Sequence, residues 1–172
     1  MILTVGHSTH PIAAFLELLA AHGVEQLMDV RTIPKSRRNP QYNSDALADA
    51  LQAAHIQYRH MPGLGGLRHP RKDSINSAWQ NDSFRGYADY MQTPAFEASL
   101  RELIEASKRH RTVIMCAEAV PWRCHRSLIA DALLARGIEV ADILSTKPAK
   151  SHTLTSFAKV AGEKVTYPGL LP

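Results

Sequence analysis

Short β-branched or apolar runs alternate along the chain with longer segments in which apolar residues have helical spacing. The short runs are "ILTV" at 2–5, "QLMDV" at 26–30, "IQYRHM" at 56–61, "TVIMC" at 112–116 and "EVADIL" at 139–144. Runs of this length are typical of strands in a parallel sheet that is buried on both faces, and "TVIMC" is the clearest of them. The pattern therefore predicts about five strands.

The longer segments predict helices between these strands. Ile12, Phe15, Leu16 and Leu19 stand at i, i+3, i+4 and i+7, and Gly23 follows as a stop signal. Further helices are predicted to begin at a capping Ser44, at Thr93-Pro94, and at about residue 122 with an end at Arg136. Strands that alternate with helices predict one α/β domain over residues 1–172. Its mainly parallel sheet would carry helices on both faces in a Rossmann-like, three-layer arrangement.

Two segments do not follow this alternation. Residues 62–92 are rich in Gly and Pro and then aromatic, which predicts a long loop with a helical insertion, and loops of that length are usually functional. Phe84, Tyr87 and Tyr90 are three residues apart, which favours packing within a helix over a platform for stacking bases. Residues 145–172 are expected to form an irregular C-terminal tail.

Composition narrows the class of protein. The chain has 172 residues, of which 45% are hydrophobic and 21% are charged, as in an ordinary soluble globular domain. No apolar run reaches the roughly 20 residues that span a bilayer, and no signal peptide is recognised, so no membrane partner is expected. Because two cysteines are too few for a disulfide scaffold, a reducing, cytoplasmic location is expected.

The positive charge is concentrated in two segments. The net charge is +4, and residues 30–44 and 59–72 each contain four Lys or Arg residues and no acid. Such segments suggest an anionic ligand, namely a phosphate-bearing small molecule, a nucleotide or a nucleic acid. A solvated basic surface without a ligand is the alternative.

Polar residues follow the predicted strands, where open α/β sheets bind ligands. They are Gly6, His7 and Ser8 after the first strand, Asp29 and Arg31 at the second, His60 at the third, and Cys116 and Glu118 at the fourth. We therefore expect a site at this edge of the sheet. Two simpler interpretations stay open, because His7 and Ser8 also suit a helix-capping turn and Asp29 could pair with Arg31.

The segment "CAEAVPWRCHRS" at 116–127 holds both cysteines. At the start of a helix, beside His125 and Arg126, Cys124 is placed where helix N–H groups and positive charge lower a thiol pKa. Cys116 or Cys124 could be a nucleophile, with Glu118 or a histidine as general acid or base. The C-x5-R spacing of tyrosine phosphatases is absent.

Two other interpretations of the same segment remain. Zinc could be held by the two cysteines and His125 with Glu118 or His7, although the spacing C-x7-C-H lacks the paired short spacings of strong zinc motifs. Both thiols could also be small buried core residues.

Several motifs together resemble one protein family. They are "TVGHST" at 4–9, "DVR" at 29–31 followed by "P-K-S-R", "LGGLR" at 64–68, "FRGYADYM" at 84–91, "MCAEAVPWRCHRSLIADALL" at 115–134 and "HTLT" at 152–155. The chain is similar in these segments to the DUF488 family. The resemblance implies an α/β fold and an enzymatic site at the motifs, but it brings no established reaction. His10 and Asp142 depart from the family pattern, which often has arginine and histidine there.

These observations lead to one hypothesis and two alternatives. We expect an enzyme, a hydrolase or transferase without a cofactor, that acts on a phosphate-bearing substrate such as a nucleotide or nucleic acid component. The candidate catalytic residues are Cys116, Glu118, Cys124, His125 and His7. The candidate substrate-binding residues are Ser8, Asp29, Arg31, Ser36, Arg37, Gly65, Gly66 and Arg126. The alternatives are a non-catalytic nucleic-acid binding domain that uses loops 31–38 and 59–72, and a structural zinc protein. The sequence names no protein partner.

Overall fold

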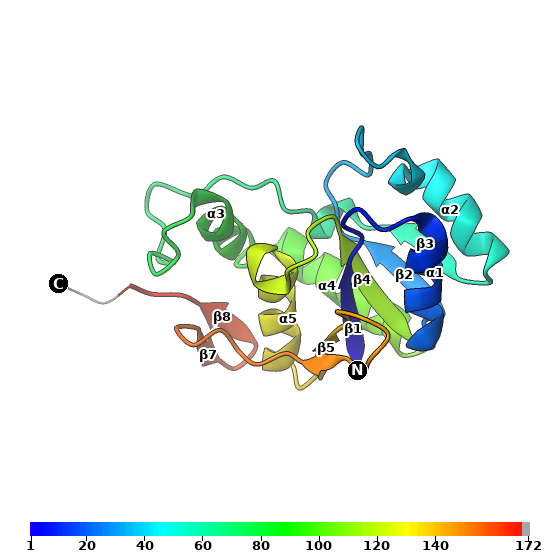
Figure 1. Ribbon diagram of the computed structural model, residues 1–172. Helices are drawn as coiled ribbons and strands as arrows, with labels where there is room; N and C mark the ends of the chain where they lie inside the picture. The colour runs from blue at the N-terminus through cyan, green and yellow to red at the C-terminus, as the bar shows by residue number, and fades with distance from the viewer. Residues whose placement is uncertain (170–172) are drawn as a thin grey trace.

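The computed structural model describes residues 1–169 as a mixed α/β fold with a central sheet (Figure 1). Its main elements are β1 (Ile2–Gly6), α1 (Ile12–Ala21), β2 (Gln26–Asp29), α2 (Ser44–Ala53), β3 (Gln57–His60), α3 (Asp82–Tyr90), α4 (Pro94–Ser107), β4 (Thr112–Cys116), α5 (Arg126–Ala135) and β5 (Val140–Asp142). The short elements are the 3-10 turns η1 (Pro40–Tyr42), η2 (Pro62–Leu64) and η3 (Pro121–Arg123), and the strands β6 (Lys150–Ser151), β7 (Lys159–Ala161) and β8 (Lys164–Thr166).

The strand order in the sheet is β3-β2-β4-β1-β5-β6. The first five of these strands run parallel, and β6 adds antiparallel to β5. All five predicted strands are present, and the mainly parallel sheet is confirmed. The sixth strand was not predicted, because its two residues are exposed and carry no apolar pattern.

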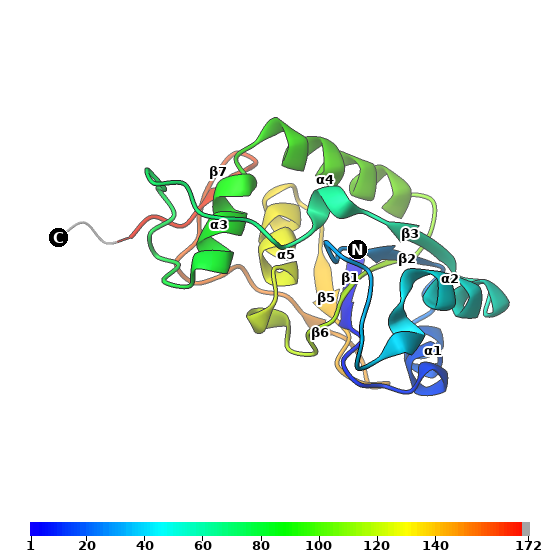
Figure 2. The same ribbon diagram turned by 90° about the horizontal axis from the view of Figure 1, so that it is seen from above.

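Helices cover both faces of the sheet (Figure 2). On one face, Leu3 and Val5 of β1 pack with Phe15 of α1 and Leu47 of α2. On the other face, the core formed by α4 and α5 includes Ile114 of β4. Two buried clusters on opposite sides of one sheet confirm the three-layer arrangement.

Helix starts agree with the sequence in one case and differ in two. The hydroxyl of Thr93 accepts the Phe96 N–H at the start of α4. Ser44 was expected to be the N-cap of α2. Asn43 is the N-cap instead, and Ser44 is the first helical residue. The prediction that the last helix begins near residue 122 was wrong. Residues 121–123 form η3, and extended backbone at Cys124 delays α5 until Arg126.

The segment 62–92 contains a helix, as predicted, and the C-terminal segment contains more structure than the sequence indicated. Within 62–92, η2 is followed by α3, whose Tyr87 is fully buried in the core. Beyond residue 145, β6 is followed by the β7–β8 hairpin. Buried Asp131 of α5 anchors this part by accepting hydrogen bonds from the Thr155 N–H and the Tyr167 hydroxyl. Residues 170–172 of the expected tail lie outside the described residues. In the described part of the chain, no helix is long and apolar enough to cross a membrane.

Candidate active site

A cavity of about 500 Å³ lies at the carboxyl ends of β2 and β4. Its wall is built from four segments: residues 31–35 after β2, Gly66 and Leu67, residues 81–84 at the start of α3, and residues 116–125. Arg31, Lys35 and Arg123 contribute positive charge to the described wall, and Glu118 contributes negative charge. The cavity is therefore basic, and it lies at the sheet edge where the sequence placed a site.

The two cysteines meet in this wall. Cys116 is the last residue of β4, and η3 turns the chain back so that Cys124 stands directly before α5. Their Sγ atoms are 2.6 Å apart, and both thiols are free. Only 3% of Cys116 and 6% of Cys124 is exposed, yet both line the cavity. Cys116 and Cys124 therefore form part of the wall that a small molecule in the cavity would contact.

His125 faces the second of these thiols. Its Nε2 lies 2.9 Å from the carbonyl oxygen of Val30, and its Nδ1 lies 3.5 Å from Cys124 Sγ. A carbonyl only accepts hydrogen bonds, so Nε2 carries a proton and Nδ1 is the nitrogen that can take one from the thiol. Gly66 makes room for the ring, because a Cβ there would stand 2.7 Å from Nδ1.

Arg126 is a buried cation in contact with the sulfur pair. The side chain is 1% exposed, and its Nε donates to Cys116 Sγ at 3.0 Å. Its terminal nitrogens donate to the Thr4 hydroxyl at 3.1 Å and to the Glu118 carbonyl at 2.5 Å. These partners are a thiol, a hydroxyl and a carbonyl, and none of them is a carboxylate; the Thr4 hydroxyl in turn donates to Asp142. A buried guanidinium stays charged and needs a counter-charge, which favours a thiolate beside it.

The two thiols have opposite pKa shifts. Burial alone raises the pKa of Cys124, but hydrogen bonds from Cys116 and His125 and the charges of His125 and Arg126 bring it well below the usual value. The Arg126 N–H also donates to Cys124 Sγ at the start of the helix. Burial, followed by the neighbouring Cys124, raises the pKa of Cys116 well above the usual value. Of the two thiols, Cys124 is therefore the one that ionises more readily, and Cys116 Sγ lies 2.6 Å from it, where its S–H can donate to the resulting thiolate.

Glu118 lies at the exposed part of the cavity wall. Its carboxylate accepts the Val120 N–H at 3.1 Å and is otherwise directed to solvent. The Glu118 backbone is fixed by Arg126 and by close contact with β1, because a Cβ on Gly6 would lie 1.9 Å from the Glu118 carbonyl oxygen. Gly6 is thus required for close approach of this loop.

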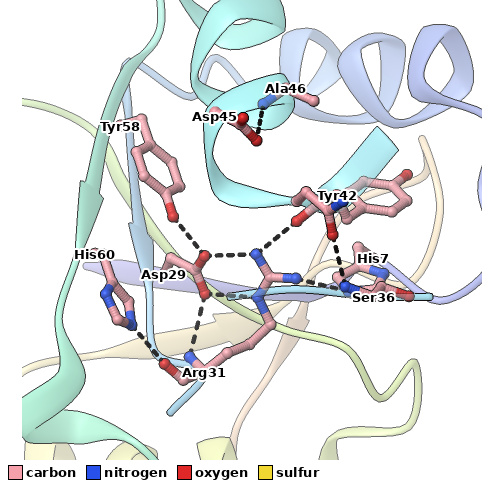
Figure 3. A network of polar contacts seen from close by, with 10 residues as sticks. His7, Asp29, Arg31, Ser36, Tyr42, Asp45, Ala46, Tyr58 and His60 are labelled. Carbon is pink, nitrogen blue, oxygen red and sulfur yellow. Dashed lines mark hydrogen bonds and ion pairs between the residues drawn. The ribbon is translucent and has the colours of Figure 1, made fainter. Parts of the chain in front are cut away.

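Asp29 and Arg31 form a buried ion pair, shown in Figure 3, and Arg31 also lines the cavity. Asp29 is fully buried, and it accepts two side-chain hydrogen bonds from Arg31 at 2.9 and 2.7 Å and one from the Tyr58 hydroxyl at 2.7 Å. Arg31 also donates to the Tyr42 carbonyl and approaches His7 Nε2 at 3.4 Å. The pairing left open by the sequence is therefore present, and it fixes the segment that forms one wall of the cavity.

His7 belongs to the same network. Its ring stacks on Tyr42 with centroids 4.0 Å apart, and its Nδ1 lies 2.8 Å from the Ser8 carbonyl. Burial lowers the pKa of His7, and the nearby Arg31 charge adds to the effect. His7 is therefore neutral near pH 7 and lies outside the cavity wall.

The other candidates stand at different distances from the cavity. Gly65 packs on Thr32, Ser8 donates its N–H to the Ala117 carbonyl, and Ser36 holds a turn with Asn43, while Arg37 is exposed. None of these four lines the cavity. The wall residues Thr32, Lys35, Phe84 and Arg123 were not predicted as site residues. The signal for Lys35 and Arg123 was their place in or beside basic motif segments.

The zinc interpretation of the two cysteines requires several ligand side chains that lie close together. Within residues 1–169, no group of three or more His, Cys, Asp and Glu side chains is placed to hold a metal ion.

Comparison with curated proteins and with solved structures gave no match. The domain of unknown function DUF488 matches residues 11–133, which include both cysteines, His125 and Arg126. Since this match spans well over half of the 172 residues, the chain belongs to the DUF488 family.

Proposed function

We propose that the protein is a cytoplasmic, thiol-dependent enzyme, a hydrolase or transferase, that acts on a phosphate-bearing substrate such as a nucleotide or nucleic acid component. One observation carries this proposal: the Cys124 thiol, with His125 Nδ1 3.5 Å from its sulfur, lies in the wall of a basic cavity. Nucleophile and base within reach of each other are the minimal parts of covalent catalysis.

The cavity suits a substrate of nucleotide size and charge. Small-molecule sites commonly have volumes of about 300–1,000 Å³, and this cavity has about 500 Å³. Lys35 and Arg123 would hold the phosphate, because the Arg31 guanidinium is already paired with Asp29. Phe84 and Leu67 offer apolar contacts for the sugar or base.

The chemistry follows from the positions of three side chains. His125 Nδ1 takes the Cys124 proton, and the thiolate attacks the electrophilic centre of the substrate. A bond forms to Sγ, and the bond to the leaving group breaks. The His125 imidazolium returns this proton to the leaving group. The Glu118 carboxylate at the solvent side then takes a proton from the water or acceptor that attacks the intermediate, breaks its bond to Sγ and releases the product. Arg126 is a positioning residue that keeps the thiolate charged.

Alkylation of the two thiols tests this proposal. The lowered pKa of Cys124 leaves it ionised below the ordinary thiol value of about 8.5, so at pH 7 iodoacetamide should label Cys124 much faster than Cys116. Labelling is followed by mass spectrometry from pH 5 to 9. His125→Gln should move the labelling of Cys124 to higher pH. Labelling of Cys124 only after unfolding would contradict the proposal.

Protection by ligands tests the substrate class. Nucleoside monophosphates and inorganic phosphate should slow the labelling of Cys124 in the wild type, and Lys35→Ala and Arg123→Ala should weaken this protection. Lys159→Ala is the matched control, because Lys159 is exposed on β7 and does not line the cavity. Equal protection in all three variants, or none in the wild type, would refute a phosphate site in this cavity.

The contacts of the basic loop 59–72 make a non-catalytic nucleic-acid binding domain a weaker candidate than the enzyme. Arg59 is paired with Glu102, Arg71 is paired with Asp73, and Arg68 stacks on the Tyr90 ring at 3.6 Å. Binding through phosphate neutralisation falls steeply with salt. Oligonucleotide binding that falls steeply between about 50 and 200 mM salt and persists in Cys124→Ser without any turnover would favour the binding domain over the enzyme.

A further inference from the structure

We propose that Cys124 and Cys116 form an oxidative modification site, in which a peroxide converts the two thiols into a reversible intramolecular disulfide. The chemistry rests on the geometry of the two thiols and on the easier ionisation of Cys124. The consequence, reversible loss of the nucleophile, rests on the proposed function.

The thiol pair has the arrangement of an attacking and a resolving cysteine. Cys124 ionises more readily than Cys116 and lines the cavity, so a small oxidant can approach it from there. Cys116 Sγ already lies 2.6 Å away. Sensitive thiols are ionised, accessible and placed next to a second thiol. The chain has no third cysteine to compete.

The first step is a two-electron oxidation of Cys124. The thiolate attacks one oxygen of hydrogen peroxide, an S–O bond forms, and the O–O bond breaks. The departing hydroxide takes a proton from solvent or from His125 and becomes water. The sulfur is oxidised to a sulfenic acid, and the peroxide is reduced.

The second step joins the two cysteines. Cys116 loses its proton, and its sulfur attacks the sulfenic sulfur of Cys124. The S–S bond forms as the S–O bond breaks, and the hydroxyl leaves with the Cys116 proton as a second water. Overall, two thiols and one peroxide give one disulfide and two waters. A small thiol reverses the change by thiol–disulfide exchange.

The surroundings are suited to this pair of steps. Arg126 donates through Nε to Cys116 and through its backbone N–H to Cys124, so it stabilises a negative charge on either sulfur as the reaction proceeds. The two sulfurs come from the end of β4 and from the residue before α5, so only their side chains and the short connection through η3 need to move.

Oxidation of the reduced protein tests the proposal without any substrate. One equivalent of hydrogen peroxide is added at pH 7, remaining thiols are blocked with N-ethylmaleimide, and the intact mass is measured. The expected product is a monomer that takes up no label, contains a Cys116–Cys124 cross-linked peptide, and regains two labels after reduction. Unoxidised thiols or a disulfide-linked dimer would overturn the proposal.

Two variants separate the roles of the cysteines. In Cys116→Ser the sulfenic acid on Cys124 should accumulate and be trapped by dimedone. In Cys124→Ser, Cys116 should react at least about tenfold more slowly, because its pKa is raised. Circular dichroism checks that both variants fold, and Cys116→Ala serves if the serine variant does not. Equal rates at both single cysteines would refute the assigned order.

These results are distinct from those of the proposed function. A disulfide that forms in a protein whose Cys124 is not protected by nucleotides would contradict the proposed function and support this inference. Protection of Cys124 by nucleotides without disulfide formation would support the proposed function and contradict this inference.

Discussion

Removal of the Asp29 carboxylate tests how the buried network of Asp29 and Arg31 is stabilised. In Asp29→Ala, the Arg31 guanidinium, which is 7% exposed, loses its counter-charge, and the Tyr58 hydroxyl loses its acceptor. Breaking a buried ion pair by removing one partner costs about 3–5 kcal/mol. We therefore expect the free energy of unfolding to fall by about this amount, a change of roughly two to four orders of magnitude in the ratio of folded to unfolded protein.

Urea unfolding followed by circular dichroism measures this loss. Glu102→Ala is the matched control, because its partner Arg59 is exposed and such pairs contribute about 0–1 kcal/mol. If Asp29→Ala does not fold, Tyr58→Phe carries the test. That variant removes one hydrogen bond to a charged acceptor and should cost about 1–3 kcal/mol. A loss for Asp29→Ala no larger than that for Glu102→Ala, at unchanged m-value, would refute the reasoning, and so would a Tyr58→Phe variant as stable as the wild type.

Two further substitutions address the imidazole and the C-terminal segment. Gly66→Ala places a Cβ 2.7 Å from His125 Nδ1, so the ring must shift and labelling of Cys124 at pH 7 should slow by about tenfold or more; an unchanged rate with intact fold would contradict the role of His125. Asp131→Ala leaves His152 and the Thr155 N–H without their acceptor and should cost about 1–3 kcal/mol. Limited trypsin digestion should then cut at Lys150 earlier than in the wild type, and identical digestion would show that other contacts hold the segment.

Most of the fold follows from the apolar pattern, because β1, β2, β4 and β5 are buried along their whole length, whereas β3 at the sheet edge alternates exposed and half-buried residues. "TVIMC" coincides with β4, and the other four runs coincide with their strands to within two residues at either end. The start of α5 could not be predicted in the same way. Apolar spacing continues through residue 124, but extended backbone at Cys124 interrupts the helix. That local break has no signature in the pattern of apolar residues.

The location of the candidate site at the sheet edge could be predicted, but the contacts of its individual residues could not. The strand-end rule placed Cys116 and Glu118 correctly at the cavity, because parallel strands end at one edge. Contact between Cys116 and Cys124 depends on the path of η3 through three dimensions, which eight residues of sequence do not determine. Whether Arg31 faces a ligand or Asp29 depends on burial, and sequence alone left both open. In the structure, the Arg31 guanidinium pairs with Asp29.

Because β1 lies in the middle of the sheet, it can pair only with strands that are synthesised much later. Leu3 pairs with Val113, 110 residues later in the chain, and with Ala141 on its other side. At translation rates of about 5–20 residues per second, the first strand waits for roughly 5–20 s before its neighbour β4 exists. During that interval the apolar strand has no native partner, so early protection must come from contacts with α1 or from a chaperone. The loop between the two thiols follows β4 directly in the chain, and the thiol site can therefore assemble only once β1 and β4 have met.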